Sequence, residues 1–298
     1  MIIGILTRNP AGWASSRLIE TASKLGYKPH PFRFRDIVVS FGSGELKVYA
    51  KGLNVIDNVD AVIVRPIGRS SLEQAIYRLD ILYTLQDYGV KLFNKPLAIE
   101  RCVDKYRSLY ILNMHGIPVP KTIVSESPGL TYNHIPLLGT KNVVIKPVFG
   151  SRGHGSTRLR LRDKDVLWEV IHSLAFTRHV LYVQEYLSHG GRDIRAFVVG
   201  DRIIAAMYRE APGMWKTNIS QGAKPVPIKR LEPEIEELVL KTTKILECEI
   251  AGVDILMVND KPYVLEVNSQ PGWRGIQSVT KVDIAKEIIE YVVKMVKA

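Results

Sequence analysis

The segment GVDILMVNDKPYVLEVN, residues 252–268, constrains the fold of this chain of 298 residues more than any other. Two apolar, β-favouring runs flank the polar residues 259–261, and this arrangement predicts an antiparallel hairpin. With those three residues in the loop, Val258 faces Pro262 and the register of the whole hairpin follows.

Three oxygen-bearing side chains interrupt this apolar hairpin. The predicted register places Asp254 directly opposite Glu266, and Asn268 lies on the same strand face as Glu266 because the two are two positions apart. Carboxylate and amide oxygens without His or Cys suit Mg²⁺ or Mn²⁺, with water and a substrate phosphate as further ligands. Solvent-facing acids are the alternative, but the apolar neighbours leave little polar surface and an unpaired buried carboxylate is costly. We therefore expect one or two divalent cations at these residues.

A glycine-rich loop, within VIKPVFGSRGHGS at residues 144–156, suggests a phosphate site. Lys146 ends a strand-like run, and seven positions then hold three glycines and two serines. Glycine lets backbone N–H groups approach and surround a phosphate. The loop fits neither a P-loop nor a dinucleotide fingerprint, since its lysine precedes the glycines and no helix pattern begins on it.

Residues 1–95 alternate strand-like and helix-like runs, which predicts a parallel sheet with helices on its faces. Ligands of such sheets lie beyond the carboxyl ends of the strands. Arg8, Arg65 and Arg69 follow two of the predicted strands and are therefore placed to meet an acidic ligand. Capping or solvation by these arginines is the alternative.

The rest of the chain divides into two α+β units, at residues 96–183 and 184–298. The first contains a predicted helix that runs on to Gly116, and then the glycine loop. The second contains RAFVVGDRIIAAM, which predicts two antiparallel strands joined at Gly200 and Asp201.

Composition limits the possible partners and the compartment. The net charge of +11 lies entirely in the first 183 residues, which suits either nucleic acid or phosphates with an acidic small molecule. No apolar run is long enough for a membrane helix and the N-terminus lacks a signal-peptide pattern, so we expect a cytoplasmic protein. Cys102 and Cys248 have no metal or redox spacing and are expected to be reduced core residues.

Taken in order, these segments resemble the ATP-grasp superfamily, and within it the RimK-like carboxylate–amine ligases. The matching pieces run from NKPLAIERCVDK through VIKPVFGSRGHG, QEYL, GGRDIRAFVVG and MYR to GVDIL and LEVNSQPG, over roughly residues 94–275. The first block is similar to the family's pre-ATP-grasp domain. The resemblance implies a pre-ATP-grasp domain at 1–95, a small lid subdomain at 96–183 and a C-terminal subdomain with the metal site at 184–298.

The resemblance also implies a role for each motif residue. ATP lies between two antiparallel sheets, and two magnesium ions are held by the metal residues named above. Asp193 binds the ribose, while Arg195 and Arg209 lie near the γ-phosphate and the reacting carboxylate. The remaining implied ATP contacts are Lys105, Lys146, Gly150, Ser151, Arg152, Gly153, Gly155, Gln184, Glu185, Tyr186 and Leu187, and the substrate contacts are Arg65, Asn218, Ser269 and Gly272.

The chemistry implied is amide formation through an acyl phosphate. Transfer of the γ-phosphoryl group to a carboxylate creates a good leaving group, which the amine of an amino acid then displaces, giving ADP and phosphate. Arg195 is expected to stabilise the tetrahedral oxyanion. The family often forms dimers or tetramers, so a homo-oligomer is expected.

The substrate prediction depends on NSQPGWRG, residues 268–275, which resembles the pattern of ligases that add L-glutamate. The acceptor predicted in this way is a pterin or a polyglutamylated deazaflavin cofactor. An amino-group carrier protein and a ribosomal-protein tail are alternatives, although Trp273 and Arg274 differ from the residues expected in the ribosomal-protein modifiers. His154 is expected to be an exposed loop residue.

A basic nucleic-acid-binding protein is the alternative from another class. RLRLRDKD, with Arg152 and Arg158 nearby, could follow a phosphate backbone. The chain lacks a known RNA-binding motif and interleaved aromatics, and the acidic hairpin would have no purpose there.

Overall fold

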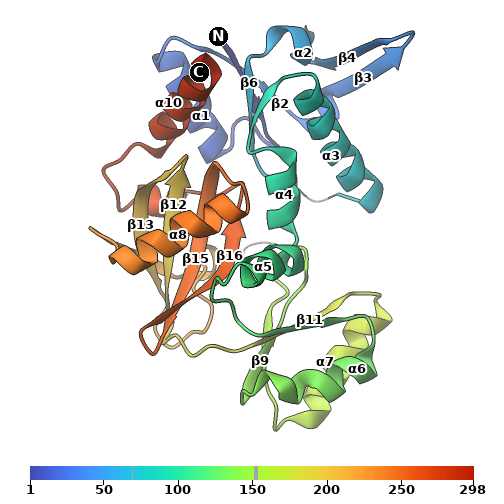
Figure 1. Cartoon of the computed structure of the whole chain (residues 1–298), viewed down its shortest axis with the longest axis vertical. Coiled ribbons are helices and arrows are strands. Elements are labelled where there is room, and N and C mark those ends of the chain that lie inside the picture. Colours follow the sequence, from blue (N-terminus) through green and yellow to red (C-terminus); the bar gives the residue numbers. More distant parts are fainter. Residues whose placement is uncertain (69, 151–153) are drawn as a thin grey trace.

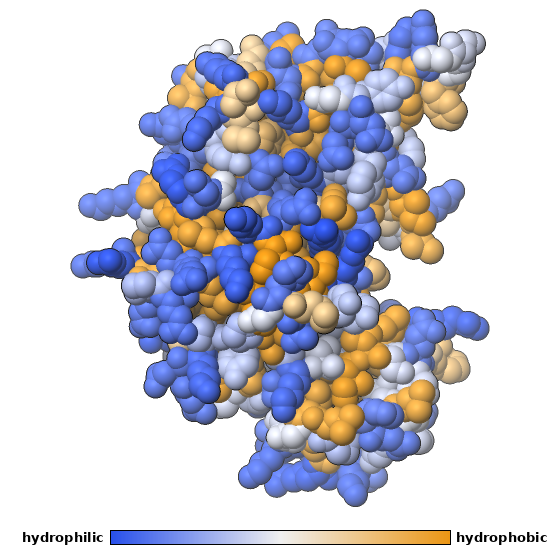
Figure 2. Space-filling model, in the orientation of Figure 1, coloured by the Kyte–Doolittle hydropathy of each residue, from blue (hydrophilic) through white to orange (hydrophobic). Residues whose placement is uncertain are grey.

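The computed structural model describes residues 1–68, 70–150 and 154–298, which form three sheet-and-helix layers stacked along the long axis (Figure 1). The N-terminal layer lies at one end, the C-terminal sheet in the middle and a small subdomain at the other end. The space-filling view shows an indentation between the middle layer and the small subdomain (Figure 2).

The N-terminal layer is built on a parallel sheet, as predicted. Its order is β2-β1-β6-β7, and every neighbouring pair is parallel. The strands are β1 (Ile2–Leu6), β2 (Lys28–Phe32), β6 (Ala61–Val64) and β7 (Lys91–Phe93), with helices α1 (Trp13–Lys24) and α3 (Leu72–Asp87). A short helix, α2 (Val55–Asn58), and an antiparallel ribbon of β3 (Ile37–Gly42), β4 (Glu45–Ala50) and β5 (Leu53–Asn54) lie beside it.

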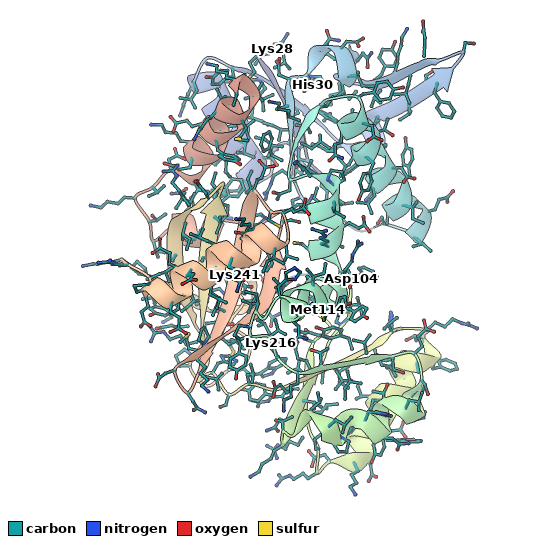
Figure 3. All side chains as sticks on the ribbon, viewed as in Figure 1. Lys28, His30, Asp104, Met114, Lys216 and Lys241 are labelled. Carbon is teal, nitrogen blue, oxygen red and sulfur yellow. The ribbon has the colours of Figure 1, made fainter. Side chains whose placement is uncertain are left out.

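Two helices rather than one connect this layer to the rest. The single helix predicted up to Gly116 is wrong, because α4 (Pro96–Val103) ends before Asp104 and α5 (Lys105–Met114) begins after it. The Asp104 carboxylate accepts a hydrogen bond from the backbone N–H of Arg107 at 3.0 Å and so caps α5. Apolar residues of both helices pack into the core of the C-terminal sheet. Figure 3 labels Asp104 at this junction.

The small subdomain is a four-stranded antiparallel sheet with helices on one face. The strand order is β10-β9-β11-β8, and a separate apolar core lies beneath it. Its elements are β8 (Thr122–Ser125), α6 (Pro128–His134), β9 (Asn142–Ile145), β10 (Thr157–Arg160), α7 (Lys164–Phe176) and β11 (Leu181–Glu185).

The C-terminal sheet is five-stranded and antiparallel, in the order β14-β13-β12-β15-β16. The predicted turn at Gly200 and Asp201 is confirmed, since Val199 pairs with Arg202 across it. The elements are β12 (Arg192–Val199), β13 (Arg202–Glu210), β14 (Lys224–Pro227), α8 (Pro233–Ile245), β15 (Ile250–Val258), β16 (Lys261–Asn268), α9 (Arg274–Gln277) and α10 (Ile284–Lys297).

The hairpin of β15 and β16, which carries the predicted metal residues, has the predicted pairing of Asp254 with Glu266 but a different turn. Its turn holds only Asn259 and Asp260, both with positive φ, so Val258 pairs with Lys261 and the predicted three-residue loop is wrong. A bulge after Asp254 then shifts the register by one residue. The two differences cancel, and Asp254 pairs with Glu266 as predicted.

Helix α10 returns the chain to the N-terminal layer. Its apolar face packs with α1 and with buried residues of β1, so both termini lie at the same end of the molecule (Figure 1). The boundaries at residues 95 and 183 stay predictions. Helices of one predicted unit pack against another unit: α4 and α5 pack on the C-terminal sheet, and α10 packs on α1.

Candidate active site

A cleft lies between the small sheet and the C-terminal sheet, and it collects most of the predicted residues. Its lining includes, from the prediction, Lys105, Lys146, Gln184, Glu185, Tyr186, Leu187, Asp193, Arg209, Asn218, Asp254 and Glu266. Lys216, labelled in Figure 3, lies between the two layers and also lines the cleft.

Lys105 reaches the cleft because Asp104 starts a new helix in front of it. Its Nζ donates to the backbone carbonyl of Gly150 at 2.7 Å, so this lysine contacts the beginning of the glycine loop. Gly155, at the other end of the loop, has a φ of +76°, which glycine adopts readily. Ser151, Arg152 and Gly153 were predicted ATP contacts and lie outside the described residues.

Lys146 follows β9 and extends from the floor of the small sheet. Its Nζ lies 5.7 Å from the centre of the Tyr182 ring. Burial lowers the pKa of Lys146 to about 8, against the opposing effect of the Glu266 carboxylate. The lysine is therefore mostly charged at neutral pH and loses its charge within the alkaline range.

Residues 184–187, which the resemblance implies as ATP contacts, lie at the end of β11, where the chain leaves the small sheet. Gln184 is buried and its amide donates to Thr122 Oγ1 at 3.0 Å, while Glu185 accepts from the backbone N–H of Lys121 at 2.8 Å. Arg158 lies over the Tyr186 ring, 4.9 Å from its centre. These contacts hold the segment in place at the edge of the cleft.

Asp193 and Arg209 form a buried ion pair on neighbouring strands. Arg209 donates Nε to Oδ1 at 2.7 Å and Nη2 to Oδ2 at 2.5 Å, and Thr217 adds a hydrogen bond to Oδ2 at 2.6 Å. The Asp193 carboxylate therefore fixes the orientation of the Arg209 guanidinium through two hydrogen bonds. A ribose contact for Asp193 stays a prediction that would use its remaining acceptor capacity.

Asp254 joins the two predicted catalytic arginines. It accepts from Arg195 Nη1 at 2.5 Å and lies 3.0 Å from Arg209 Nη2. Burial alone would raise the pKa of Asp254, but the charges of Arg195 and Arg209 lower it below its usual range. Burial likewise opposes the charge of Arg209, whose pKa is nevertheless raised by the two carboxylates. Two acids and two arginines therefore neutralise one another beneath the cleft.

Glu266 and Asn268 complete the predicted metal set on β16. Both are half-buried, and no hydrogen bond or ion pair engages either side chain within the described chain. Asp254 retains acceptor capacity on both oxygens beside its arginines. No three acidic, His or Cys side chains gather among the described residues, and the third member of the predicted set is the Asn268 amide. This all-oxygen set fits Mg²⁺ or Mn²⁺.

Arg65 lies where the N-terminal sheet meets the loop after β16. It is buried at the carboxyl end of β6, and its Nη1 donates to the Pro271 carbonyl at 2.9 Å. Its guanidinium lies 4.5 Å above the Trp273 ring, while its Nε has no partner among the described residues. Burial lowers the pKa of Arg65 to about 10, so it stays charged at neutral pH.

The other predicted substrate residues are divided between the loop after β16 and the cleft. Ser269 is buried beside the same loop, and Gly272 has open space around it. Asn218 lines the cleft between the small sheet and the C-terminal sheet. Arg8 and His154 are exposed, the latter as predicted, and Arg69 lies outside the described residues.

Sequence reasoning assigned no structural role to three residues that organise the site. Thr217 binds Asp193, Trp273 stacks under Arg65, and Asn94 bonds to the first residue of β15 and to the residue that follows β16. Asn94 Nδ2 donates to the carbonyls of Ile250 and Ser269, and its Oδ1 accepts from the Ile250 N–H at 2.9 Å. The family resemblance drew attention to the segments of Asn94 and Trp273, whereas no sequence signal pointed to Thr217.

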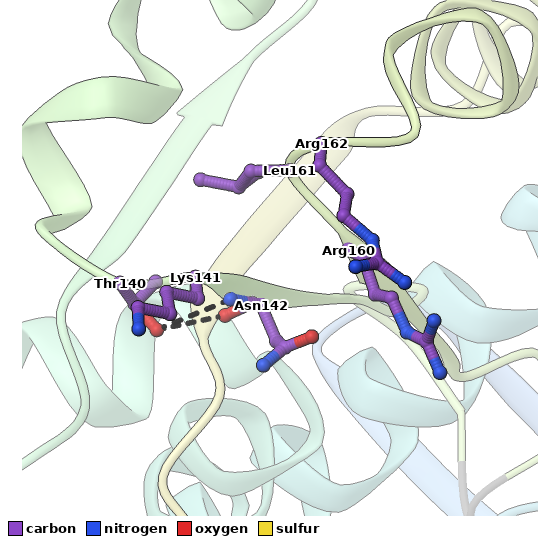
Figure 4. A pocket seen from close by; sticks show the side chains of 6 residues that line it. All are labelled: Thr140, Lys141, Asn142, Arg160, Leu161 and Arg162. Atoms are coloured by element: carbon purple, nitrogen blue, oxygen red, sulfur yellow. Dashed lines mark hydrogen bonds between the residues drawn. The ribbon is translucent and has the colours of Figure 1, made fainter.

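A second hollow, of about 670 Å³, lies at the outer edge of the small subdomain. Figure 4 shows its lining of Thr140, Lys141, Asn142, Arg160, Leu161 and Arg162, with a hydrogen-bonded turn between Thr140 and Asn142. None of the predicted site residues lines it.

Comparison with known proteins decides the family. The RimK-like ATP-grasp domain matches residues 102–292, and the RimK pre-ATP-grasp domain matches residues 1–99. The chain belongs to the RimK-like ATP-grasp family. The predicted fold is confirmed, and so is the predicted enzyme class, an ATP-dependent carboxylate–amine ligase.

Relatives over the full length are named as ligases. A probable alpha-L-glutamate ligase of Legionella pneumophila (strain Corby) is 33% identical over 100% of this chain and 97% of its own length. A probable alpha-L-glutamate ligase of Pseudomonas paraeruginosa is 35% identical over 99% of this chain and 96% of its own.

Solved structures share the fold of this RimK-like ligase. The ATP-grasp ligase PsnB, complexed with a phosphomimetic variant of its minimal precursor, Mg and ADP, has a TM-score of 0.73 at 20% identity and covers 98% of this chain and 97% of its own. The RimK domain ATP-grasp protein of Sphaerobacter thermophilus has a TM-score of 0.74 at 18% identity, covering 98% and 100%. The prediction of ATP and Mg²⁺ agrees with these findings. No helix among the described residues is long and apolar enough to cross a membrane.

Proposed function

We propose that this RimK-like ligase joins the amine of L-glutamate to a carboxylate of an acidic acceptor, using Mg-ATP and an acyl-phosphate intermediate. The observation that carries the proposal is the composition of the cleft. Lys105, Lys146 and Arg209 meet Asp254 and Glu266 there, between two antiparallel sheets. Cations for phosphates and oxygens for a metal thus share one space, as phosphoryl transfer requires.

Asp254, Glu266 and Asn268 would hold the magnesium. Bound there, Mg²⁺ supplies charge neutralisation on the transferred phosphoryl group. The ion pairs of Asp254 with Arg195 and Arg209 fix the carboxylate before any ligand arrives, so the site needs little reorganisation.

The lysines divide the work of binding phosphates. Lys146 approaches from the strand beneath the glycine loop, and Lys105 from the helix N-terminus beside it. Both donate to oxygens that gain charge during transfer, and their origin in different elements lets them enclose the phosphates from two sides.

The acceptor carboxylate then becomes an acyl phosphate, and the glutamate amine displaces phosphate to give the amide. Arg195 is proposed to stabilise the oxyanion of this second step. Its Nη1 is held by Asp254 and the rest of its guanidinium lies over Gly252, so the group is already oriented. No residue need act as a covalent nucleophile.

Arg65 is proposed to bind a carboxylate of the acceptor. It is charged and buried, no carboxylate contacts it among the described residues, and it lies beside the loop that follows the metal strand. Together with the basic excess of the first 183 residues, this favours an acidic acceptor, and a pterin or polyglutamylated cofactor is our first choice. A carrier-protein tail and a ribosomal-protein tail are the alternatives.

The test is ADP release with Mg²⁺ and ATP against a panel of acceptors, each with and without L-glutamate. The panel holds a reduced pterin, a polyglutamylated deazaflavin, an acidic carrier-protein tail and a ribosomal tail peptide. We expect glutamate-dependent ADP release with one acceptor, and a mass increase of one glutamyl unit. ADP release that L-glutamate does not stimulate, with no mass change on any acceptor, would contradict the proposal.

A further inference from the structure

Two cysteines that are far apart in the sequence touch in the fold. Cys102 lies in α4 and Cys248 in the turn between α8 and β15, and their sulfur atoms are 3.4 Å apart. Both side chains are buried, with 8% and 6% of their surface exposed. Both cysteines lie in the core, as expected, and the fold also brings their sulfur atoms into contact.

Neighbouring contacts hold the two segments together along their length. Arg101 Nη1 donates to Glu247 Oε1 at 2.7 Å, one residue before each cysteine. Asn94, at the beginning of the same segment, accepts from the backbone N–H of Glu249 at 2.7 Å and donates to the Ile250 carbonyl at 2.7 Å. We call this the α4–β15 seam: residues 94–102 against 247–250.

The seam brings the sulfurs close enough to bond with little movement. A disulfide has an S–S length of about 2.0 Å, so the two atoms need to approach by roughly 1.4 Å. The approach calls for rotation of the cysteine side chains, and the contacts on both sides hold the two backbone segments together. The pairing is thus a property of the fold and not of the sequence spacing.

We propose that Cys102 and Cys248 form a reversible disulfide that joins α4 to the start of β15. A low-molecular-weight disulfide supplies the oxidation. One thiolate attacks it and releases one reduced thiol, and the second cysteine then attacks the mixed disulfide and releases the other. The protein loses two protons and two electrons, and the reagent takes them up as it is reduced to two thiols.

The bond would change stability rather than catalysis. It joins two positions that are 146 apart in the sequence, and the closed loop contains the small subdomain and much of the C-terminal sheet, which restricts the unfolded chain. Neither cysteine lines the cleft, and the seam already joins the two elements in the reduced form. We therefore expect a higher melting temperature of the oxidised protein and an unchanged ADP-forming rate.

The test treats the full-length protein with glutathione disulfide at alkaline pH, or with a reducing agent, and then alkylates it in urea. Alkaline pH is chosen because the hydrogen bond to Cys102 and burial raise the pKa of the Cys248 thiol. We expect two alkyl groups on the reduced protein and none on the oxidised protein, a cross-linked peptide pair containing both cysteines, and a raised melting temperature. Cys102→Ser and Cys248→Ser should each abolish the peptide pair and the temperature shift.

Urea-unfolded protein, treated in the same way, shows whether both thiols can react at all. If the unfolded chain reacts while the native protein still takes up two alkyl groups, the proposal is wrong. A native protein that carries glutathione on one cysteine without closing the bond would overturn it equally.

Discussion

Asp254 lies directly opposite Glu266 across β15 and β16, yet the two carboxylates have different surroundings. Asp254 is buried between Arg195 and Arg209, whereas Glu266 is half-buried and faces the cleft. The Asp254 carboxylate therefore stabilises the protein through its ion pairs, whereas the Glu266 carboxylate is available for a ligand. The two should therefore respond differently to neutralisation.

Asp254→Asn is expected to destabilise the protein by about 3 kcal/mol or more, because the buried Arg195 loses its carboxylate partner and Arg209 keeps only Asp193. Glu266→Gln should leave the free energy of unfolding nearly unchanged but raise the Mg²⁺ concentration for half-maximal activity at least tenfold, roughly the loss typical of ligand-shell changes. Urea unfolding and Mg²⁺ titrations of both variants check this contrast. Equal losses of stability would contradict it.

Lys146 predicts a pH dependence of nucleotide binding. The phosphates need the charged lysine, and burial lowers its pKa to about 8. The charge is present below this pH and is lost as the pH rises through it, so ATP affinity should fall by up to about tenfold per pH unit in the alkaline range. Calorimetric titrations with ATP at several pH values measure the slope.

Lys146→Arg is the matched control, since a guanidinium keeps its charge over this range. Its ATP affinity can differ from that of the wild type at neutral pH, but its dependence on alkaline pH should be much flatter. The same alkaline slope in both proteins would assign the effect to another group.

Arg65→Lys tests the acceptor site. Lysine keeps the charge but loses the planar contact with Trp273 and the fixed direction of the donors. The KM for the acceptor should rise about tenfold or more, as for a lost charged hydrogen bond, while the KM for ATP stays the same. Arg35→Lys, at an exposed position of the same layer, should change neither value. An equal rise in both KM values would point to general damage.

Gly252 gives a steric test of Arg195. A Cβ atom at this position would lie 2.5 Å from Arg195 Nη2, so Gly252→Ala must displace the guanidinium from Asp254. We expect kcat to fall by about a hundredfold, the loss typical of one oxyanion donor. Gly129→Ala, where the added atom meets open space, should keep full activity. Wild-type kcat in Gly252→Ala would exclude Arg195 from the chemical step.

The sequence predicted the parts of this fold that depend on local patterns. Alternating apolar runs identified the parallel sheet and the hairpin turn at Gly200, and the pairing of Asp254 with Glu266 was right. The three-residue turn predicted for the hairpin of residues 252–268 was wrong, since only Asn259 and Asp260 form it. The bulge after Asp254 was not predicted, because it depends on tertiary packing that no short-range pattern records.

Contacts between distant segments could not be read from spacing. Cys102 and Cys248 meet only because α4 packs against the beginning of β15, and Trp273 meets Arg65 only because the loop after β16 reaches the N-terminal sheet. The break at Asp104 is local, but its signal was lost within a strongly helical stretch. Such residues are determined by packing and not by sequence period.

The most direct test of the proposed mechanism follows the oxygen atoms of the acceptor. An acceptor identified by the panel is labelled with ¹⁸O in its carboxylate and incubated with Mg²⁺, ATP and L-glutamate. An acyl-phosphate route predicts that one labelled oxygen passes into the released phosphate for each amide formed. Unlabelled phosphate, released together with the amide product, would show that the carboxylate is never phosphorylated and would contradict the account.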